Sequence, residues 1–191
     1  MTKDFEDNKL VMLSCAGDAY AFEMLLNRHY KTIFRIAYKW CGHQENAEDI
    51  TQNVCIKLSR AIHSYKEKST FTSWLYRIVI NSAIDWQRSH KNYNDHKNTE
   101  DEHISSATSS PEGDLYMKEI MTQINDLPEK EKTALLLTSS EGLSHKDVSV
   151  IMECKESTVS WYIHEARKKL TNTLDIKENH KTGNKKEQGH G

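Results

Sequence analysis

The chain has 191 residues, and its 26 Lys and Arg against 28 Asp and Glu give a formal net charge of −2. At ~100–200 residues per domain, this length corresponds to one large domain or two small ones. Hydrophobic residues make up 37% of the chain, less than the ~45–50% of typical globular domains, which disfavours one large compact domain. No stretch approaches the ~18 apolar residues that a membrane-spanning helix needs. Seven Gly and two Pro are few for an all-β fold, so we expect an all-α protein.

The cysteines and the first residues indicate the cellular compartment. Cys15, Cys41, Cys55 and Cys154 are widely spaced and form no C-x-x-C pair, so we expect a reducing compartment and no disulfide framework. The N-terminal segment MTKDFEDNK is charged and lacks the apolar core of a secretory signal. The sequence therefore predicts a cytoplasmic protein.

Two polar stretches divide the chain. Residues 95–114 carry six acidic side chains against one lysine, and Ile104 is their one large apolar residue. Such a stretch cannot offset its ordering entropy by burial, and the same holds for the polar tail. We expect an N-terminal extension (1–9), a helical domain (10–94), an acidic flexible linker (95–114), a second helical domain (115–174) and a disordered tail (175–191).

Apolar residues of the first domain recur at helical spacing. Asp18 is a candidate N-cap for a helix from Ala19, and Gly42 is a candidate C-terminal glycine. The predicted core stripe of this helix is Phe22, Leu26, Tyr30, Ile33, Ala37 and Trp40. Further predictions are a second helix capped by Asn46, with Ile50, Val54, Leu58 and Ala61 in the core, and a third helix from Phe71 to about His90.

One polar face of the second helix is a candidate contact surface. Its residues follow spacings of four, three and four, with Gln52 beside them: Asp49, Asn53, Ile56 and Arg60. An exposed Ile among polar groups indicates a protein contact. The alternative is an ordinary solvated face with one isolated Ile.

The third helix carries a second candidate surface. Arg77, Asn81, Ile84 and Arg88 repeat the same spacing beside Trp74. Cations and an amide suit a nucleic-acid backbone, and an aromatic ring suits unstacked bases. The alternative is a surface ion pair of Asp85 with Arg77 or Arg88, together with a Trp in the core.

The second domain reads as a helix-turn-helix. Pro128 opens one helix, Gly142 and Ser144 mark the next turn and N-cap, and a tight turn at Glu153 leads into a longer helix. The expected buried residues are Val148, Ile151, Val159, Ile163, Ala166 and Leu170. The expected DNA-facing residues are Lys155, Ser157, Thr158, Ser160, Trp161, His164, Arg167 and Lys168. The alternative is a three-helix protein-binding domain.

Catalytic motifs are absent from the sequence. It contains no nucleotide-binding glycine loop, no G-x-S-x-G and no H-E-x-x-H, and the close pair Cys41 and His43 has no second pair at ligand spacing. We therefore expect neither an enzyme nor a bound metal or cofactor.

Three stretches carry a family resemblance. AEDITQNVCIKLSRAI (47–62) and FTSWLYRIVINSAIDWQRS (71–89) resemble conserved region 2 of the extracytoplasmic-function (ECF) sigma factors. LPEKEKTALLLTSSEGLSHKDVSVIMECKESTVSWYIHEARKKL (127–170) resembles their region 4. The resemblance implies two small helical domains on a flexible linker, which bind core RNA polymerase and direct it to promoters. It implies contacts with the clamp helices of the largest polymerase subunit and the flap of the second-largest, and an anti-sigma factor is a further candidate partner.

The resemblance also implies roles for individual residues. Asp49, Gln52 and Asn53 match the family's clamp-docking run, with Asn53 in place of the usual Glu, and Ile56 and Arg60 lie on the same face. The helix from Phe71 and the loop before it match the segment that holds the −10 element and a flipped base. The residues implied there are Ser64, Tyr65, Lys66, Lys68, Trp74, Arg77, Asn81 and Arg88.

Region 4 departs from the family pattern. Glu153 replaces the turn glycine, Ser160 and Tyr162 replace two cations, and Glu165 stands where a basic residue is common. Fewer cations predict a weaker phosphate attraction at the −35 element. Two alternatives stay open. One is a helix-turn-helix regulator that is not a polymerase subunit, but such a protein would have no use for a surface formed by Asp49, Gln52 and Asn53. The other is a decoy that binds polymerase without reading −35 DNA.

Overall fold

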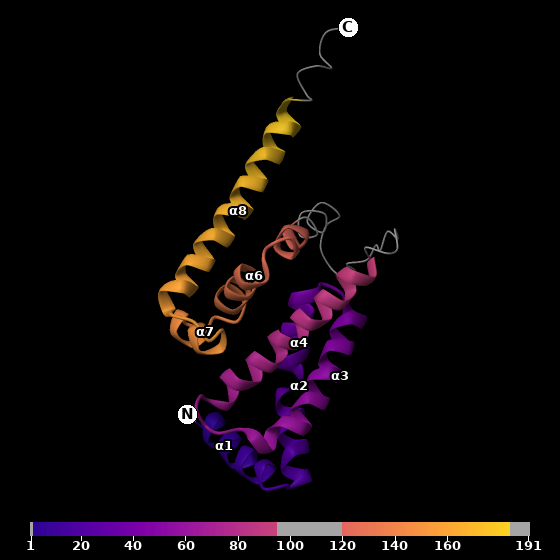
Figure 1. Cartoon of the computed structure of the whole chain (residues 1–191), viewed down its shortest axis with the longest axis vertical. Helices are drawn as coiled ribbons and strands as arrows, with labels where there is room; N and C mark the ends of the chain where they lie inside the picture. The colour runs from indigo at the N-terminus through magenta and orange to yellow at the C-terminus, as the bar shows by residue number, and fades with distance from the viewer. Residues whose placement is uncertain (1, 95–119, 184–191) are drawn as a thin grey trace. The chain divides into compact units, whose positions relative to one another are not determined.

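The computed structural model describes residues 2–94 and 120–183, which form two compact helical domains without a strand in either described range. Figure 1 shows the helices of each domain. The all-α prediction is confirmed. The predicted linker, residues 95–114, and the last residues of the predicted tail, 184–191, lie outside the described residues.

The first domain consists of α1 (Thr2–Cys15), α2 (Ala19–Cys41), α3 (Gln44–Ala61), the 3₁₀ turn η1 (Ile62–Ser64) and α4 (Phe71–Asn94). Helix α2 packs against α1, α3 and α4 (Figure 1). Apolar side chains from these helices fill the centre of the domain; those buried most completely include Ile33, Trp40, Ile50, Val54, Leu75 and Val79. This core fixes α3 and α4 side by side.

Local chemistry sets the ends of α2 as predicted. The Asp18 carboxylate accepts a hydrogen bond from the Ala21 N–H at 3.0 Å. Gly42 adopts a left-handed conformation with φ 73°, and its N–H donates to the Tyr38 carbonyl at 2.7 Å. The prediction for α3 is wrong, because this helix begins at Gln44 and not after a cap at Asn46.

In the first half of α2, each buried residue lies one position before the residue predicted to be buried. Ile33, Ala37 and Trp40 are buried as expected, whereas Phe22 and Leu26 are half-buried and Tyr30 is 43% exposed. The residues buried in their place are Ala21, Leu25 and His29.

Helix α1 explains this shift, and it also occupies part of the predicted N-terminal extension, 1–9. Asp7 of α1 is buried, and its carboxylate lies 2.8 Å from His29 Nε2 and 2.7 Å from Arg28 Nη1. A buried polar network of this kind specifies one packing arrangement. Packing of α1 therefore decides which side of α2 is covered.

The second domain contains α6 (Glu129–Leu135), the π-helical segment η2 (Leu136–Ser140), α7 (His145–Ile151) and α8 (Glu156–Gly183). Helix α6 packs against α8, where Leu127, Leu135 and Ala166 form a buried cluster with Leu170 against it. The other buried residues predicted for this domain are confirmed: Val148, Ile151, Val159 and Ile163.

The helix-turn-helix geometry is confirmed. The Ser144 hydroxyl accepts from the Asp147 N–H at 3.1 Å, and the Asp147 carboxylate accepts from the Ser144 N–H at 3.3 Å, a reciprocal capping box at the start of α7. Glu153, in the turn before α8, has a left-handed backbone with φ 52°. This is the position where the resemblance implies a glycine.

Helix α8 is longer than the sequence predicts. A disordered tail is expected from residue 175, but α8 continues to Gly183. No Gly or Pro interrupts the chain between Glu156 and Gly183, and the Lys and Glu residues of this stretch are good helix formers.

Candidate functional site

A groove of about 460 Å³ runs between α3 and α4. It brings together four of the five residues predicted as a protein-contact face: Asp49, Gln52, Asn53 and Ile56. The fifth, Arg60, is exposed further along α3 but does not line the groove. The 4-3-4 spacing thus identified one wall of a real concavity.

Apolar and charged groups meet in this groove. Ile56 is 49% exposed, which is unusual for a β-branched apolar side chain among polar neighbours. Lys57 of α3 forms an ion pair with Asp85 of α4, with Nζ 3.0 Å from Oδ2. Asp49 adds a second carboxylate, exposed on α3, which can pair with a basic side chain of a partner.

The second wall of the groove comes from α4 and was missed by sequence reasoning. It consists of Ser82, Asp85, Trp86, Ser89 and His90. The Trp86 and His90 rings stack at a centroid distance of 4.0 Å. Ser82 Oγ and Trp86 Nε1 are buried, and neither has a hydrogen-bond partner among the described residues. Both atoms therefore lie beneath the groove surface, and the polar side chains that a partner can reach on this wall are those of Asp85, Ser89 and His90.

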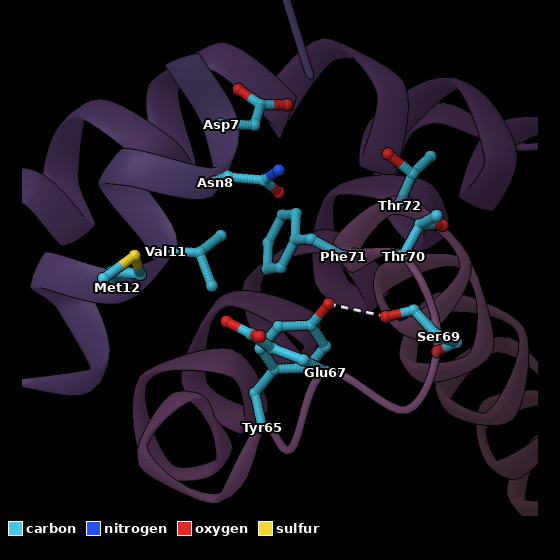
Figure 2. A pocket seen from close by; sticks show the side chains of 10 residues that line it. All are labelled: Asp7, Asn8, Val11, Met12, Tyr65, Glu67, Ser69, Thr70, Phe71 and Thr72. Carbon is cyan, nitrogen blue, oxygen red and sulfur yellow. Dashed lines mark hydrogen bonds between the residues drawn. The ribbon is translucent and has the colours of Figure 1, made fainter. Parts of the chain in front are cut away.

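A second concavity lies beside the loop that precedes α4. This pocket of about 470 Å³ has one wall from α1 and one from the loop and the start of α4 (Figure 2). Its lining residues are Asp7, Asn8, Val11, Met12, Tyr65, Glu67, Ser69, Thr70, Phe71 and Thr72. The volume falls within the ~300–1,000 Å³ of small-molecule sites.

Aromatic rings shape this pocket. The Tyr65 ring lies 6.0 Å from Phe71 and 5.2 Å from Trp74, centroid to centroid. Its hydroxyl donates to the Ser69 carbonyl at 2.6 Å (Figure 2). Burial raises the pKa of Tyr65, and the Glu67 carboxylate raises it further. The hydrogen bond of the phenol links the two ends of the loop, Tyr65 and Ser69.

None of the other residues predicted for this surface lines the pocket. Ser64, Lys66 and Lys68 are exposed before and within the loop. Trp74 and Arg77 are half-buried on α4, and Asn81 and Arg88 are exposed further along it. Sequence reasoning missed the α1 wall of the pocket, because it treated the first residues as an extension.

Helix α8 presents the predicted polar face. Ser157, Trp161, His164 and Lys168 are all exposed, as are Lys155, Ser160 and Arg167, while Thr158 is half-buried. Trp161 is 55% exposed, and its ring contacts Tyr162 edge-on at 5.3 Å. The Ser160 hydroxyl joins α8 to α7 through a 3.0 Å hydrogen bond with His145 Nδ1.

Within the ranges that the structure describes, no group of three or more His, Cys, Asp or Glu side chains could hold a metal ion. No helix there is long and apolar enough to span a bilayer. Burial raises the pKa of Cys15, Cys55 and Cys154, so none of these thiols is activated as a nucleophile.

Comparison with known proteins identifies the family. The models for sigma-70 region 2 and sigma-70 region 4 match residues 25–93 and 117–170. The RNA polymerase sigma-H factor of Pseudomonas aeruginosa is 30% identical over 181 residues, covering 88% of this chain and 94% of that protein. The chain belongs to the sigma-70 family. The ECF RNA polymerase sigma-E factor of Haemophilus influenzae is 30% identical over 186 residues, and the match covers 91% of this chain and 98% of that protein. Within the sigma-70 family, the chain is therefore an ECF sigma factor.

Solved sigma factors share the fold of this one. CnrH in complex with the cytosolic domain of CnrY matches with a TM-score of 0.67 at 20% identity, covering 90% of this chain and 98% of that chain. The sigma factor RpoE in complex with the anti-sigma factor NepR from Bartonella quintana matches with a TM-score of 0.62, also at 20% identity. This match covers 81% of this chain and 97% of that chain.

The family settles the class of function. As an ECF sigma factor the chain is an alternative transcription initiation factor and not an enzyme. The region 2 match includes both the groove and most of the α4 face, which decides against a helix-turn-helix regulator that is not a polymerase subunit.

Proposed function

We propose that this ECF sigma factor docks on the clamp helices of the largest subunit of core RNA polymerase through the groove between α3 and α4. The groove combines the carboxylate of Asp49 and the exposed side chain of Ile56 on α3 with the polar side chains of α4 along its second wall. An amphipathic helix can place basic residues against Asp49 and apolar residues against Ile56 at the same time. This groove is the observation that carries the proposal.

The α4 face and the adjoining pocket are assigned to the −10 element. Asn81 and Arg88 are exposed along α4, where an amide and a cation can hold the DNA backbone. Tyr65 and Trp74, both half-buried, offer aromatic surface beside a pocket large enough for one base, and the buried ring of Phe71 packs against both. Base flipping costs a few kcal/mol, which stacking on such rings can offset.

Helix α8 is assigned to the −35 element, with the second domain also contacting the polymerase flap. Three exposed cations lie at the two ends of its polar face: Lys155, which directly precedes α8, and Arg167 and Lys168 on α8. The protein would act in the cytoplasm with the polymerase. The solved relatives bound to CnrY and NepR support an anti-sigma factor as a further partner.

A charge reversal in the groove tests the docking proposal. Asp49→Arg combined with Gln52→Ala should abolish capture of the protein by immobilised core polymerase, while the helical circular dichroism signal stays unchanged. Glu48→Arg is the matched control, because Glu48 is exposed on the same helix outside the groove. Capture of the double variant at the wild-type level would refute the assignment.

A further inference from the structure

Trp161 occupies an unusual place on α8. Among the described side chains of this helix it is the one large apolar group that is exposed, at 55%. It lies in the N-terminal half of the helix, the part of a helix-turn-helix recognition helix that meets base edges in the major groove. The Tyr162 ring, edge-on at 5.3 Å, limits the positions that the indole can take.

The surroundings of Trp161 fit DNA. Lys155 lies before it and Arg167 and Lys168 after it, all exposed, where they can contact DNA phosphates on either side of the indole, while Glu156 and Glu165 keep the net positive charge of the face small. Ser160, the neighbouring hydroxyl, is already engaged with His145 Nδ1 at 3.0 Å and the Glu156 carbonyl at 3.2 Å. The indole is therefore left as the large contact group at the centre of this face.

The chemistry of the indole selects its target. An indole has one N–H donor and no acceptor, and most of its surface is apolar. In the major groove the apolar group that distinguishes one base from the others is the C5 methyl of thymine. We infer that Trp161 reads the C5 methyl group of a thymine in the −35 element, an inference that rests on the proposed role of α8.

Deoxyuridine provides the direct test. It pairs as thymidine does and keeps the O4 acceptor but lacks the methyl group. The −35 sequence is first obtained by selecting bound DNA from a randomised pool with the holoenzyme of full-length protein and core polymerase. Each thymine of that sequence is then replaced singly by deoxyuridine. At one or two positions wild-type holoenzyme should bind about fourfold more weakly, the value of one buried methyl-sized group.

Protein variants assign that loss to the indole. Trp161→Ala should bind the thymine and uracil duplexes equally, and because Trp161 is exposed the variant should keep the wild-type circular dichroism spectrum. Tyr20→Ala is the matched control, since Tyr20 is an aromatic residue 72% exposed on α2. It should keep the wild-type ratio of thymine to uracil affinity.

Three outcomes overturn the inference. In the first, the wild-type holoenzyme binds the thymine and uracil duplexes equally well at every position but still transcribes from the selected DNA. That result would leave the proposed function intact. The second is a Trp161→Ala variant that keeps the thymine preference. In the third the holoenzyme selects no sequence, and the proposed function fails together with the inference.

Discussion

At the scale of single residues, Asn53 is the clearest departure from the family within the groove. It lines the concavity beside Asp49 and Gln52, in the place where the resemblance implies a Glu. A partner that evolved to meet a carboxylate there would find one charge missing. If the groove docks on the polymerase as proposed, the docking energy comes from Asp49 and from the apolar contact of Ile56.

Restoring this charge should strengthen docking. Asn53→Glu should raise the affinity for core polymerase about twofold to fivefold, the value of one partly exposed ion pair. The gain should shrink as salt increases. Titration of fluorescent protein with core enzyme at two salt concentrations measures both effects. Asn53→Gln is the uncharged control, and equal affinities of the Glu and Gln variants would show that no cation faces this position.

The α4 face makes a second residue-level prediction. Asn81 is exposed, so Asn81→Ala should leave stability nearly unchanged. Loss of its hydrogen bond to DNA should slow promoter opening about tenfold, since a hydrogen bond to a charged group contributes ~1.5 kcal/mol or more. Permanganate footprinting of the −10 region follows the opening.

Asn27→Ala is the matched control, because Asn27 is also exposed but lies on α2. It should open promoters at the wild-type rate. Normal permanganate reactivity with Asn81→Ala would mean that this face of α4 does not hold the −10 element.

At the scale of secondary structure elements, the turn before α8 carries backbone strain. Glu153 has φ 52°, a conformation that costs a residue with a Cβ about 1–2 kcal/mol. Glu153→Gly should therefore stabilise the second domain by about 1 kcal/mol, after the extra chain entropy of glycine is counted. Thermal unfolding measures the change.

Two variants control this prediction. Glu153→Ala removes the carboxylate but keeps the Cβ, so it should not give the same stabilisation. Gly142 has φ 67°, and the space that a Cβ would occupy there is open. Gly142→Ala should therefore destabilise the domain by about 1 kcal/mol through its backbone alone. If Glu153→Gly were no more stable than Glu153→Ala, the backbone at this position would not be strained.

Sequence patterns predicted the elements whose signals are local. The N-caps at Asp18 and Ser144 and the terminal Gly42 depend on a few neighbouring residues, and the structure has all three. The buried residues in the first half of α2 were predicted wrongly, because adjacent apolar pairs such as Leu25 and Leu26 allow two alternative buried stripes. Packing of α1 chooses between them.

Helix α1 itself could not be predicted from apolar spacing. The described residues that it buries are Asp7, Val11 and Ser14, and two of these three are polar. Its place in the fold depends on the contacts of Asp7 with Arg28 and His29. The α4 wall of the groove and the α1 wall of the pocket could not be predicted from local patterns either, because both form where helices distant in sequence pack together.

At the scale of the whole molecule, the two sigma regions are separate helical domains, and the acidic stretch 95–114 between them stays a prediction. About 20 residues of flexible chain would span roughly 25 Å on average. Its six acidic residues suggest a polyanion mimic that occupies a basic channel of the polymerase. The alternative is a tether whose charges only maintain solubility.

Removing charge without changing length separates these roles. With Glu100, Asp101 and Glu102 all replaced by Ser, a polyanion mimic predicts weaker core affinity, a shallower salt dependence and an altered yield of abortive transcripts. Shortening the stretch by about ten residues is the control for reach. Wild-type behaviour of the Ser variant, with loss of activity on shortening, would show that reach alone matters.

This sigma factor directs core polymerase to promoters, and we propose that it does so by docking through the groove between α3 and α4. Genomic DNA of the source organism, transcribed in vitro by core polymerase with 5′ ends mapped by sequencing, tests both parts. Wild-type protein and the Glu48→Arg control should create the same discrete set of start sites, absent with core alone. The variant with Asp49→Arg and Gln52→Ala should create none. No discrete start sites with wild-type protein, or an unchanged set with the double variant, would contradict the account.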